Sequence, residues 1–466
     1  MEVLYVKKLD MVIKNGTVVT ASDCYKADLG IVNGKIEVMG SGLEKYADKV
    51  IDAEGKYVFP GGIDPHTHMD MPFGGTFSSD NFNTGTKAAA CGGTTTIVDF
   101  AVQPKGKSLK DTAKIWREKS DNKACIDYGI HIVITDMNED IMNEIPEIIK
   151  SGYSSFKLFM TYDGMMVDDD TLMKTLTKVS SNGGLTCVHA ENYYVIKYYT
   201  KKLLDEGKTE PKYHAISRPD LCEGEAAGRA IKLAELCNTP LYIVHNTCEA
   251  SASEIARARK KGYPIMGETC PQYLLLSYDN YEEPDFNGSK YVMSPPLRDK
   301  KNWPYLWEAL KNNTLQAVST DHCPFFMEQK RMGINDFTKI PNGAPGVELR
   351  MPLMYTYGVL ERKLTLQKFV EVTSTNVAKI FGMYPQKGTI AIGSDADLVI
   401  FDPNKEVTVT QSMLNENVDY TPFEGFKLKG YPEITLSRGE VIAKDGKYIG
   451  SEGRGKFIKR GVPEII

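Results

Sequence analysis

Short runs that alternate apolar and polar positions mark both ends of the chain. Near the start they are interrupted by Asn15-Gly16 and Asn33-Gly34, and Asn-Gly between alternating runs is the strongest short-range signal for a β-hairpin. The runs at the start and the end of the chain are 10–14, 17–20, 28–32, 35–39, 395–401 and 439–446. We expect the two ends to pair in one small β-sandwich.

Between these ends the pattern changes to apolar strands followed by amphipathic helical stretches. The predicted strands are 57–59, 94–100, 128–134, 154–160, 185–189, 241–245, 264–268 and 315–321. The clearest helical stretches are 109–119, 170–180, 223–236 and 250–261. Repeated strand-helix units favour a parallel sheet that closes into a barrel. The predicted fold class is therefore α/β, a (β/α)8 TIM-type barrel with a smaller β-sandwich domain formed from both chain termini.

The change of pattern also predicts the domain boundaries. Residues 1–57 and 385–466 are assigned to the β-sandwich domain, and residues 58–384 to the barrel. Two segments inside the barrel, 193–223 and 325–349, are longer than ordinary connections. Long loops of this kind tend to carry or cover functional sites, so we expect them to cover the site.

Composition and charge narrow the class of protein. The 466 residues are 42% hydrophobic and 25% charged, which is typical of a soluble globular protein. A formal net charge of −5, without a long run of Lys and Arg, gives no sign of the basic surface that binds nucleic acid or an anionic membrane. We expect a small-molecule substrate, with neither nucleic acid nor membrane as a partner.

The start of the chain and the cysteines indicate the compartment. No apolar run approaches the roughly 18 residues that a membrane span needs, and residues 1–5 lack the basic-then-apolar layout of a secretory signal. Nine scattered cysteines, an odd number without a Cys-x-x-Cys pair, favour reduced thiols. The expected location is cytoplasmic.

The candidate chemistry begins at His66 and His68, which follow an apolar strand. Residues i and i+2 of an extended segment project to the same face, so both imidazoles can reach one point in space. In a barrel of this kind the active site lies at the carboxyl ends of the strands. His189, His245 and Asp321 occupy the equivalent ends of the fifth, sixth and eighth predicted strands. Convergence of these side chains on one mouth predicts a metal site.

Lys157 is the unusual residue of the fourth predicted strand, because an unpaired ammonium is costly to bury. Pairing with an acid across the barrel is one explanation, but neighbouring histidines and a metal would repel an ammonium. A desolvated neutral amine can instead react with carbon dioxide to give N6-carboxylysine, whose oxygens can bridge two cations. His66, His68 and Asp321 would then hold one metal, and His189 and His245 the other. Such ligands suit Zn2+ first, with Mn2+, Co2+ or Fe2+ possible.

The chain also resembles a known family. The stretches that carry the resemblance are 60–75, 92–100, 156–162, 188–192, 293–298, 319–325 and 341–348. They resemble the dihydropyrimidinases and D-hydantoinases, the cyclic amidohydrolase branch of the amidohydrolase superfamily. The resemblance implies a barrel with a β-sandwich, two divalent metal ions, a carboxylated Lys157, and a homotetramer, with a homodimer as the other possibility.

The same resemblance assigns roles at the site. Tyr162 resembles the family's oxyanion donor, and Ser294 and Asn342 resemble residues that orient the substrate through their backbone groups. Opening a cyclic amide needs a nucleophile, charge stabilisation on the carbonyl oxygen and a proton for the departing nitrogen. A metal-bridging hydroxide would attack the ring carbonyl, and Asp321 would carry its proton to the nitrogen. Expected substrates are 5,6-dihydropyrimidines, 5-substituted hydantoins or both, opened to N-carbamoyl amino acids.

Two other functions stay open at this point. The first is allantoinase or dihydroorotase activity. Dihydroorotase-like relatives carry Arg two residues after the second histidine, where this chain has Asp70, and a carboxylate there disfavours an anionic ring. The second is a non-catalytic scaffold of the collapsin response mediator type, which has lost ligands. All six ligand positions are filled in this chain, which disfavours the scaffold.

Several other polar and apolar residues receive more ordinary interpretations. We expect His131 in the core, His214 on the surface, His322 in a supporting role and Asp99 supporting a rim histidine or ending its strand. Cys323 has no apparent base to activate it. The residues expected to form an apolar wall for the exocyclic group of the substrate are Met69, Phe73 and Phe159.

Overall fold

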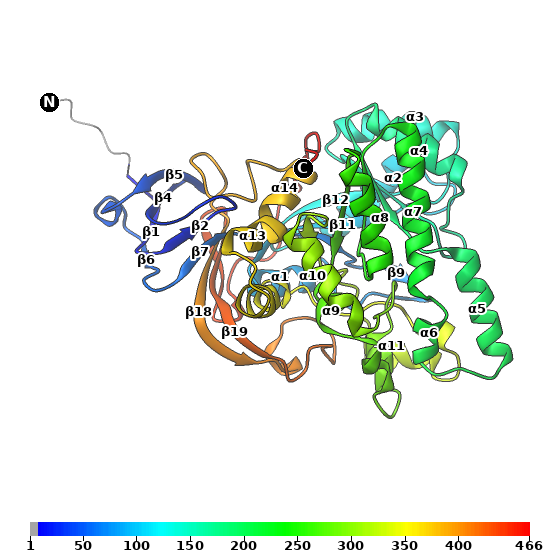
Figure 1. The fold of residues 1–466 in the computed structure, drawn as a ribbon. Helices are drawn as coiled ribbons and strands as arrows, with labels where there is room; N and C mark the ends of the chain where they lie inside the picture. Colours follow the sequence, from blue (N-terminus) through cyan, green and yellow to red (C-terminus); the bar gives the residue numbers. More distant parts are fainter. Residues whose placement is uncertain (1–7) are drawn as a thin grey trace.

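The computed structural model describes residues 8–466 and contains one barrel, two larger β-sheets and a two-stranded ribbon (Figure 1). The residues on which the absence of a secretory signal was predicted, 1–5, lie outside the described part. Among residues 8–466, no helix has both the length and the apolar character that crossing a membrane requires.

Eight parallel strands form the barrel and confirm the predicted architecture. In chain order they are β8 (Gly62–Thr67), β11 (Thr94–Val102), β12 (Asp127–Val133), β13 (Ser155–Phe159), β14 (Leu185–His189), β15 (Leu241–Ile243), β16 (Ile265–Thr269) and β17 (Ala317–Val318). The ring is completed just beyond the first and last strands, where Thr67 pairs with His322 in a parallel bridge. There the His68 N–H donates to the His322 carbonyl at 2.9 Å. The segment that carries His66 and His68 therefore lies beside the segment that carries Asp321.

Helices follow the strands and cover the outside of the barrel (Figure 1). They are α1 (Thr84–Cys91), α2 (Leu109–Ser120), α3 (Glu139–Lys150), α4 (Asp169–Ser180), α7 (Asp220–Cys237), α8 (Glu249–Lys260) and α10 (Trp303–Lys311). The side chains of Ser108, Asn138 and Asp168 accept backbone N–H groups at the starts of α2, α3 and α4. The four helical stretches predicted from the sequence are therefore confirmed within a few residues at each end.

The two long segments contain further short elements. The first holds α5 (Tyr193–Asp205) and α6 (Lys212–Ile216), and the second holds α11 (Met327–Lys330) with short 3-10 turns. The remaining α-helices are α9 (Pro271–Leu275), α12 (Arg350–Leu353), α13 (Leu366–Val370) and α14 (Asn376–Ile380), and two π-helical segments, Met354–Glu361 and Glu371–Thr375, lie between the last three. The first long segment is therefore mostly helical, whereas much of the second is irregular.

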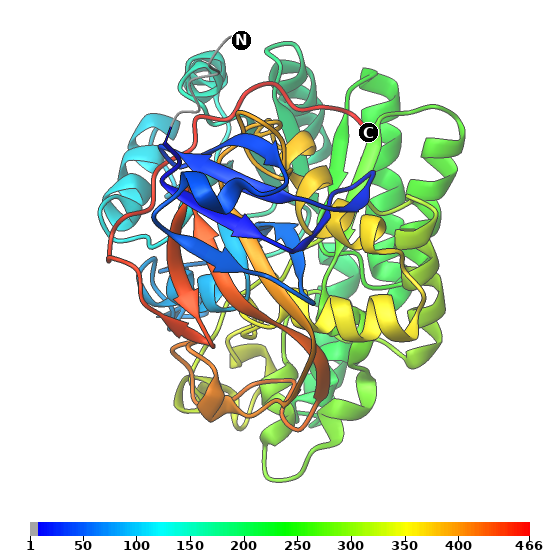
Figure 2. The same cartoon turned by 90° about the vertical axis from the view of Figure 1, so that its left-hand side faces the viewer.

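The two ends of the chain form a separate, mostly β unit of two sheets (Figure 2). One sheet has the order β5-β4-β1-β6 and the other β21-β20-β19-β18-β7-β2-β3. The strands are β1 (Met11–Lys14), β2 (Thr17–Val19), β3 (Cys24–Lys26), β4 (Asp28–Val32), β5 (Lys35–Gly40), β6 (Val50–Asp52), β7 (Tyr57–Pro60), β18 (Leu398–Thr408), β19 (Lys427–Ser437), β20 (Glu440–Lys444) and β21 (Lys447–Tyr448). Ile13 and Ile31 from the first sheet share one apolar core with Leu398 from the second. A two-stranded ribbon, β9 (Pro72–Phe73) and β10 (Thr76–Phe77), lies apart from both.

The strand predicted at 57–59 forms, but it does not belong to the barrel. It is part of β7, which pairs with β18 and β2, so the first barrel strand is β8. The chain changes sheets at Gly61, where an added Cβ would lie 2.1 Å from the Thr95 hydroxyl oxygen. One apolar run thus supplies two consecutive strands, and its length alone did not reveal the break. The division into domains at 57/58 and 384/385 stays a prediction.

A buried ionic cluster joins the terminal unit to the barrel. Lys387 Nζ lies 2.6 Å from a carboxylate oxygen of Asp127, at the start of β12, and 2.6 Å from one of Asp397. A third carboxylate, Asp395, lies 3.1 Å from it. The three acids raise the pKa of Lys387, although burial opposes them. The ammonium therefore compensates several carboxylates that would otherwise be buried together.

Replacing this lysine should destabilise the fold without touching the barrel mouth. Lys387→Met leaves Asp397 without a cationic side-chain partner among residues 8–466, while Arg438 stays 3.4 Å from Asp127 and Lys35 3.2 Å from Asp395. We expect the free energy of unfolding to fall by about 3–5 kcal/mol. Urea denaturation measures it. Lys174→Met, which removes an exposed i,i+4 pair with Asp170, is the control and should change the value by less than about 1 kcal/mol. Equal stabilities of the two variants would contradict the role given to the cluster.

Candidate metal centre

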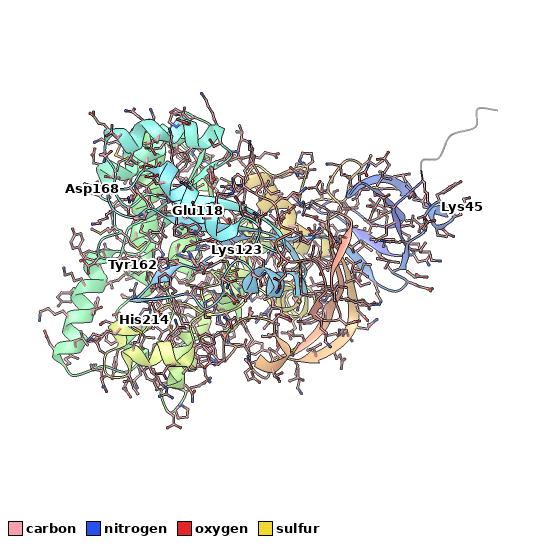
Figure 3. All side chains as sticks on the ribbon, turned by 180° about the vertical axis from the view of Figure 1, so that it is seen from behind. Lys45, Glu118, Lys123, Tyr162, Asp168 and His214 are labelled. Carbon is pink, nitrogen blue, oxygen red and sulfur yellow. The ribbon has the colours of Figure 1, made fainter. Side chains whose placement is uncertain are left out.

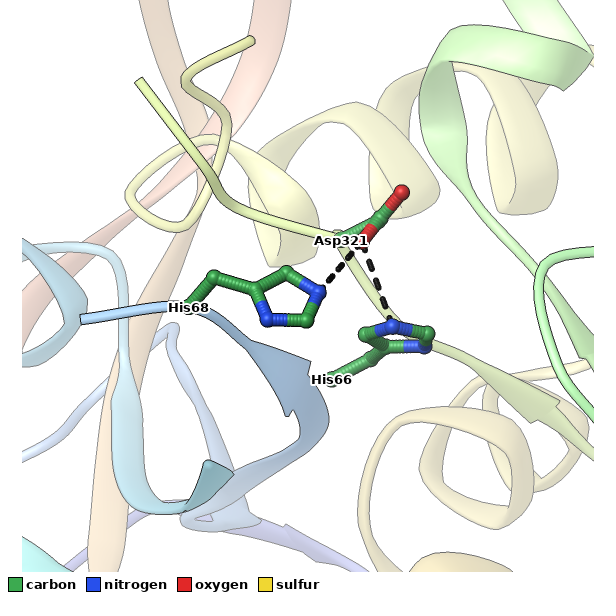
Figure 4. A group of neighbouring side chains, drawn as sticks. All are labelled: His66, His68 and Asp321. Carbon is green, nitrogen blue, oxygen red and sulfur yellow. Dashed lines mark hydrogen bonds and ion pairs between the residues drawn. The ribbon is translucent and has the colours of Figure 1, made fainter. Parts of the chain in front are cut away.

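The first group of predicted ligands is assembled as expected at the mouth of the barrel. His66 and His68 come from the end of β8, and Asp321 follows β17 (Figure 4). Asp321 Oδ1 lies 3.2 Å from His66 Nε2 and 3.1 Å from His68 Nε2. The ligand atoms of the three side chains all lie within 4.8 Å of one another. Two imidazoles and one carboxylate converging in this way are a common protein site for a divalent cation.

The second group lies beside the first. His189 ends β14 and His245 stands two residues after β15, and their ring centroids are 4.5 Å apart. The rings of His66 and His245 are 5.2 Å apart, which joins the two groups. All the predicted ligand side chains therefore line one pocket, with Lys157 of β13 among them.

Lys157 is almost fully buried, with 1% of its surface exposed. Its Nζ lies 5.0 Å from the ring centroid of Phe100 and 5.2 Å from that of Phe159. Within the described residues it has neither a hydrogen bond nor an ion pair. The acid partner that would explain an ordinary buried lysine is thus missing from residues 8–466. Burial lowers the pKa of the amine to about 8, which increases the fraction of neutral, nucleophilic amine relative to an exposed lysine.

Two buried glutamates orient His66 and His189, and neither glutamate was predicted from the sequence. Glu268, in β16, lies 2.5 Å from His66 Nδ1 and also accepts the Tyr242 hydroxyl at 2.9 Å. Glu191 lies 2.8 Å from His189 Nε2 and is paired with the Arg218 guanidinium at 2.9 Å. Each contact occupies one ring nitrogen and leaves the other for a metal. Glu268 was detectable as an acid at the end of the seventh predicted strand, to which no role had been assigned.

The electrostatics of the pocket suit metal ligands. Burial is the main cause that lowers the pKa values of His66, His189 and His245, with the charge of Lys157 contributing. Neutral imidazoles are the form that binds metals. His245 Nδ1 is buried and lacks a hydrogen-bond partner within residues 8–466. An unpartnered nitrogen on a buried histidine fits the binding of a cation.

The backbone is strained where the site residues stand. Tyr162, His245 and Asp321 have φ angles of 74°, 37° and 53°, in the left-handed region that residues other than Gly rarely adopt. Each such residue costs roughly 1–3 kcal/mol, and such residues cluster at functional sites. The strain turns these side chains toward the mouth directly after their strands.

The predicted substrate residues line the same pocket, where the Tyr162 ring lies 5.3 Å from that of His189. Tyr162, Ser294 and Asn342 all line it, and Asn342 Oδ1 has no hydrogen-bond partner among the described residues. Burial is the main cause that raises the pKa of Tyr162 above its ordinary value. The phenol therefore keeps its proton at neutral pH and can donate it in a hydrogen bond.

The apolar wall of the pocket differs in one residue from the prediction. Phe73 and Phe159 line the pocket as expected, and Met71 lines it in place of Met69. Met69 is fully buried in the main core instead. Asp70 is also absent from the lining, because its backbone turns with a φ of 55° between the two methionines. The residue two positions after His68 therefore does not contact the pocket in this chain.

The expectation that His214 lies on the surface is wrong. It belongs to α6, is 3% exposed, and lies near Tyr162 on the same side of the barrel (Figure 3). Its Nε2 donates to the Met293 carbonyl at 2.8 Å and lies 3.4 Å from Ser294 Oγ. Burial lowers the pKa of His214 to about 3. The polar sequence around it indicated a loop, and only the packing of the long segment shows the burial.

The remaining predictions about polar residues agree with the structure. His131 is a core residue, bound to Ser155 Oγ and the Pro65 carbonyl. Asp99 lies within β11 and accepts the Met69 N–H at 2.8 Å, so it holds the backbone next to His68. His322 is buried and pairs with Asp80 at 3.0 Å. Burial raises the pKa of the Cys323 thiol well above its ordinary range, which disfavours a thiolate nucleophile.

With this site on a barrel, the comparisons with known proteins identify the class. The chain belongs to the amidohydrolase family, whose match covers residues 57–442. The family implies a metal centre, and the His66, His68 and Asp321 cluster is where such a centre would lie.

Relatives within the class are similar over nearly the whole chain. The chain is 51% identical to a D-hydantoinase of Geobacillus stearothermophilus, over 96% of each sequence. It is 50% identical to a D-hydantoinase of Ralstonia pickettii, over 97% of this chain and 99% of that one. The crystal structure of a dihydropyrimidinase from Brevibacillus agri NCHU1002 superposes with a TM-score of 0.96 at 52% identity, covering 97% of this chain and 99% of that chain.

The contact between Glu268 and His66 gives a test of the metal centre. Glu268→Gln keeps the shape but replaces the carboxyl group at His66 Nδ1, which a bound cation would help to ionise, with a neutral amide. We expect metal affinity to fall by about 10–100-fold, measured by competition with a chelator. Glu348→Gln alters another buried glutamate, which binds Asn415 instead of a histidine, and should leave the affinity within a factor of about two. Undiminished affinity in Glu268→Gln would contradict the support role.

Proposed function

We propose that the protein hydrolyses the cyclic amide bond of 5,6-dihydropyrimidines, 5-substituted hydantoins or both, and releases N-carbamoyl amino acids. The relatives named D-hydantoinase and dihydropyrimidinase support this reaction over the full length of the chain. The observation that carries the proposal is the single pocket in which the metal-ligand cluster faces Tyr162, Ser294 and Asn342. One half of the pocket can activate water, and the other half can hold a planar amide ring.

Two divalent metal ions are proposed as the cofactor, Zn2+ first and Mn2+, Co2+ or Fe2+ as the other possibilities. His66, His68 and Asp321 would hold one ion, and His189 and His245 the other. Lys157, as N6-carboxylysine, would contribute to both. When bound, such ions supply Lewis acidity and a water molecule that loses its proton near neutral pH.

The side chains of the pocket supply the remaining steps. Asp321 is placed to take the proton of the attacking water and to return it to the departing ring nitrogen. The Tyr162 hydroxyl donates a hydrogen bond to the carbonyl oxygen as negative charge develops there. Backbone groups at Ser294 and Asn342 pair with the amide edge of the ring. Met71, Phe73 and Phe159 give the exocyclic substituent an apolar surface.

The alternatives weighed from the sequence are less well supported. A dihydroorotase must bind a ring that carries a carboxylate, and none of the described residues that line this pocket is an arginine. Allantoinase activity has no specific observation in its favour, and the named relatives do not support either of these two activities. A scaffold would not need all six ligand positions filled, with Lys157 among them.

The assembly and the location are part of the proposal. We infer a homotetramer, with a homodimer as the alternative, on the basis of the family resemblance. Apolar side chains on the outer helices fit burial between copies of the chain, since Tyr198 of α5 and Leu236 of α7 are 66% and 75% exposed. All nine cysteines are free, which fits a reducing compartment such as the cytoplasm.

Replacing Lys157 should remove the bound metal while the protein stays folded. Lys157→Ala loses the proposed carboxylated side chain, so we expect most of the bound metal and the activity to disappear. Short carboxylates such as acetate should restore part of both, because they can occupy the vacated space. Metal analysis and dihydrouracil turnover measure the effect. A Lys157→Ala protein that retains its full metal content would rule out the proposed binuclear site.

The phenol hydroxyl of Tyr162 should affect turnover rather than metal binding. Tyr162→Phe removes one hydrogen bond to the developing oxyanion, so kcat should fall by about 10²-fold or more. Release of N-carbamoyl-β-alanine from dihydrouracil measures kcat, and the metal content serves as the control. An unchanged kcat would remove Tyr162 from the mechanism.

A further inference from the structure

A second buried lysine lies beneath the substrate half of the pocket. Lys330, the last residue of α11, is 0% exposed. Its Nζ donates to three backbone carbonyls, those of Val292 at 2.9 Å, Pro341 at 2.7 Å and Gly343 at 2.7 Å. A lysine ammonium has three N–H donors and no acceptor, so its capacity is completely used.

Burying the Lys330 ammonium costs more free energy than burying an apolar side chain that only fills space. Among residues 8–466, no carboxylate forms an ion pair with Lys330, and burial lowers the pKa of its amine to about 7. Transferring a charged group from water to a protein interior without a counter-charge is costly. An apolar side chain of similar length would fill the same volume without that cost. The three carbonyl contacts therefore indicate a positional role.

The three carbonyls belong to the two segments that carry the proposed ring-binding residues. Val292 lies two residues before Ser294, and Pro341 and Gly343 flank Asn342. The two segments also touch directly, since the Gly343 N–H donates to the Val292 carbonyl at 3.0 Å. Lys330 thus joins two parts of the chain that are about fifty residues apart in sequence.

Neighbouring elements hold both segments from the other side. The segment with Ser294 is fixed by His214, which donates to the Met293 carbonyl at 2.8 Å. The segment with Asn342 is fixed by the Cys323 N–H, which donates to the Ala344 carbonyl at 3.1 Å. Substitution of Gly343 is also restricted, because an added Cβ would lie 2.2 Å from the Cys323 carbonyl oxygen. Between the two segments, the ammonium adds three contacts to the hydrogen bond that the Gly343 N–H donates to the Val292 carbonyl.

We propose that Lys330 is a positioning residue for ring recognition, whose ammonium sets the spacing between the backbone of Ser294 and that of Asn342. Lys330 does not line the pocket, so it acts through these backbone groups and does not touch the substrate. With the correct spacing, the backbone groups match the two ring N–H groups of a dihydropyrimidine. The inference rests on the proposed function, because it requires these segments to bind the amide edge of a ring.

Discrimination between two rings tests this proposal directly. Dihydrouracil has two ring N–H groups, whereas in glutarimide a CH2 group replaces one of them. A site with matched backbone groups rejects the ring that leaves one of its groups unpaired. The ratio of kcat/KM for dihydrouracil to that for glutarimide is measured with the metal-loaded protein. Because both substrates use the same active molecules, the ratio does not depend on how much of a preparation is folded.

In Lys330→Met we expect this ratio to fall about tenfold or more, with a raised KM for dihydrouracil and the wild-type metal content. Lys387→Met is the matched control, since it removes another buried lysine at a distance from the pocket. It should be less stable than the wild type but keep the ratio. Lys330→Gln, which retains an N–H donor group, should give an intermediate ratio and replaces Lys330→Met in the test if that variant does not fold.

Two results would overturn the inference. One is a wild-type ratio in folded Lys330→Met or, where that variant does not fold, in Lys330→Gln. The other is an equal loss of the ratio in Lys387→Met, which would attribute the effect to general destabilisation. Wild-type protein that opens neither these two rings nor a hydantoin would instead contradict the proposed function itself, so the two failures are distinguishable.

Discussion

Several basic side chains share a buried space at the mouth of the barrel, and the rest of the site is arranged around the repulsion between them. Four imidazoles and the Lys157 amine line the same pocket, and positive charges at such distances repel strongly in a medium of low dielectric constant. Burial reduces the conflict, because it lowers the pKa values of His66 and His189 and so favours neutral imidazoles, and it lowers the pKa of Lys157 to about 8, which increases its neutral fraction. Neutral nitrogen ligands and a neutral amine are also what a metal centre and a carboxylated lysine require.

The surrounding acids complete this arrangement. Glu191 remains ionised although it is buried, because the charge of Arg218 and the hydrogen bond from His189 outweigh the effect of burial and lower its pKa to about 2. Glu268 is different, since burial raises its pKa to about 8 despite the Tyr242 hydroxyl and the charge of Lys157. The fold therefore places one permanent negative charge behind His189 and one carboxyl that a bound cation would help to ionise behind His66.

Much of this could be predicted from the sequence, for a physical reason. Parallel strands bring their carboxyl ends to one edge, so the positions of His66, His68, His189, His245 and Asp321 after strands were enough to predict a shared site. The barrel and the terminal β unit followed from the hydrophobic periods. The family resemblance, rather than the periodicity, pointed to Tyr162, Ser294 and Asn342, which the structure places in the same pocket.

The errors came from features that depend on tertiary packing. The break at Gly61 lies inside one apolar run, so the periodicity did not separate β7 from β8. His214 stands in a polar segment, and its burial depends on how α6 packs against the rest of the chain. Met71 replaces Met69 in the pocket because Asp70 reverses the backbone. Lys330 gave no sequence signal, since a lysine in a polar helix is ordinarily exposed.

The reaction assigned to this pocket is the opening of neutral cyclic amides. The most direct measurement is the ranking of kcat/KM for the zinc-reconstituted protein on dihydrouracil, hydantoin, phenylhydantoin, allantoin and dihydroorotate. The account predicts that dihydrouracil or one of the hydantoins ranks first and that dihydroorotate ranks last, because the lining lacks a group for its carboxylate. A ranking led by dihydroorotate or allantoin, or turnover of none of the five, would contradict it.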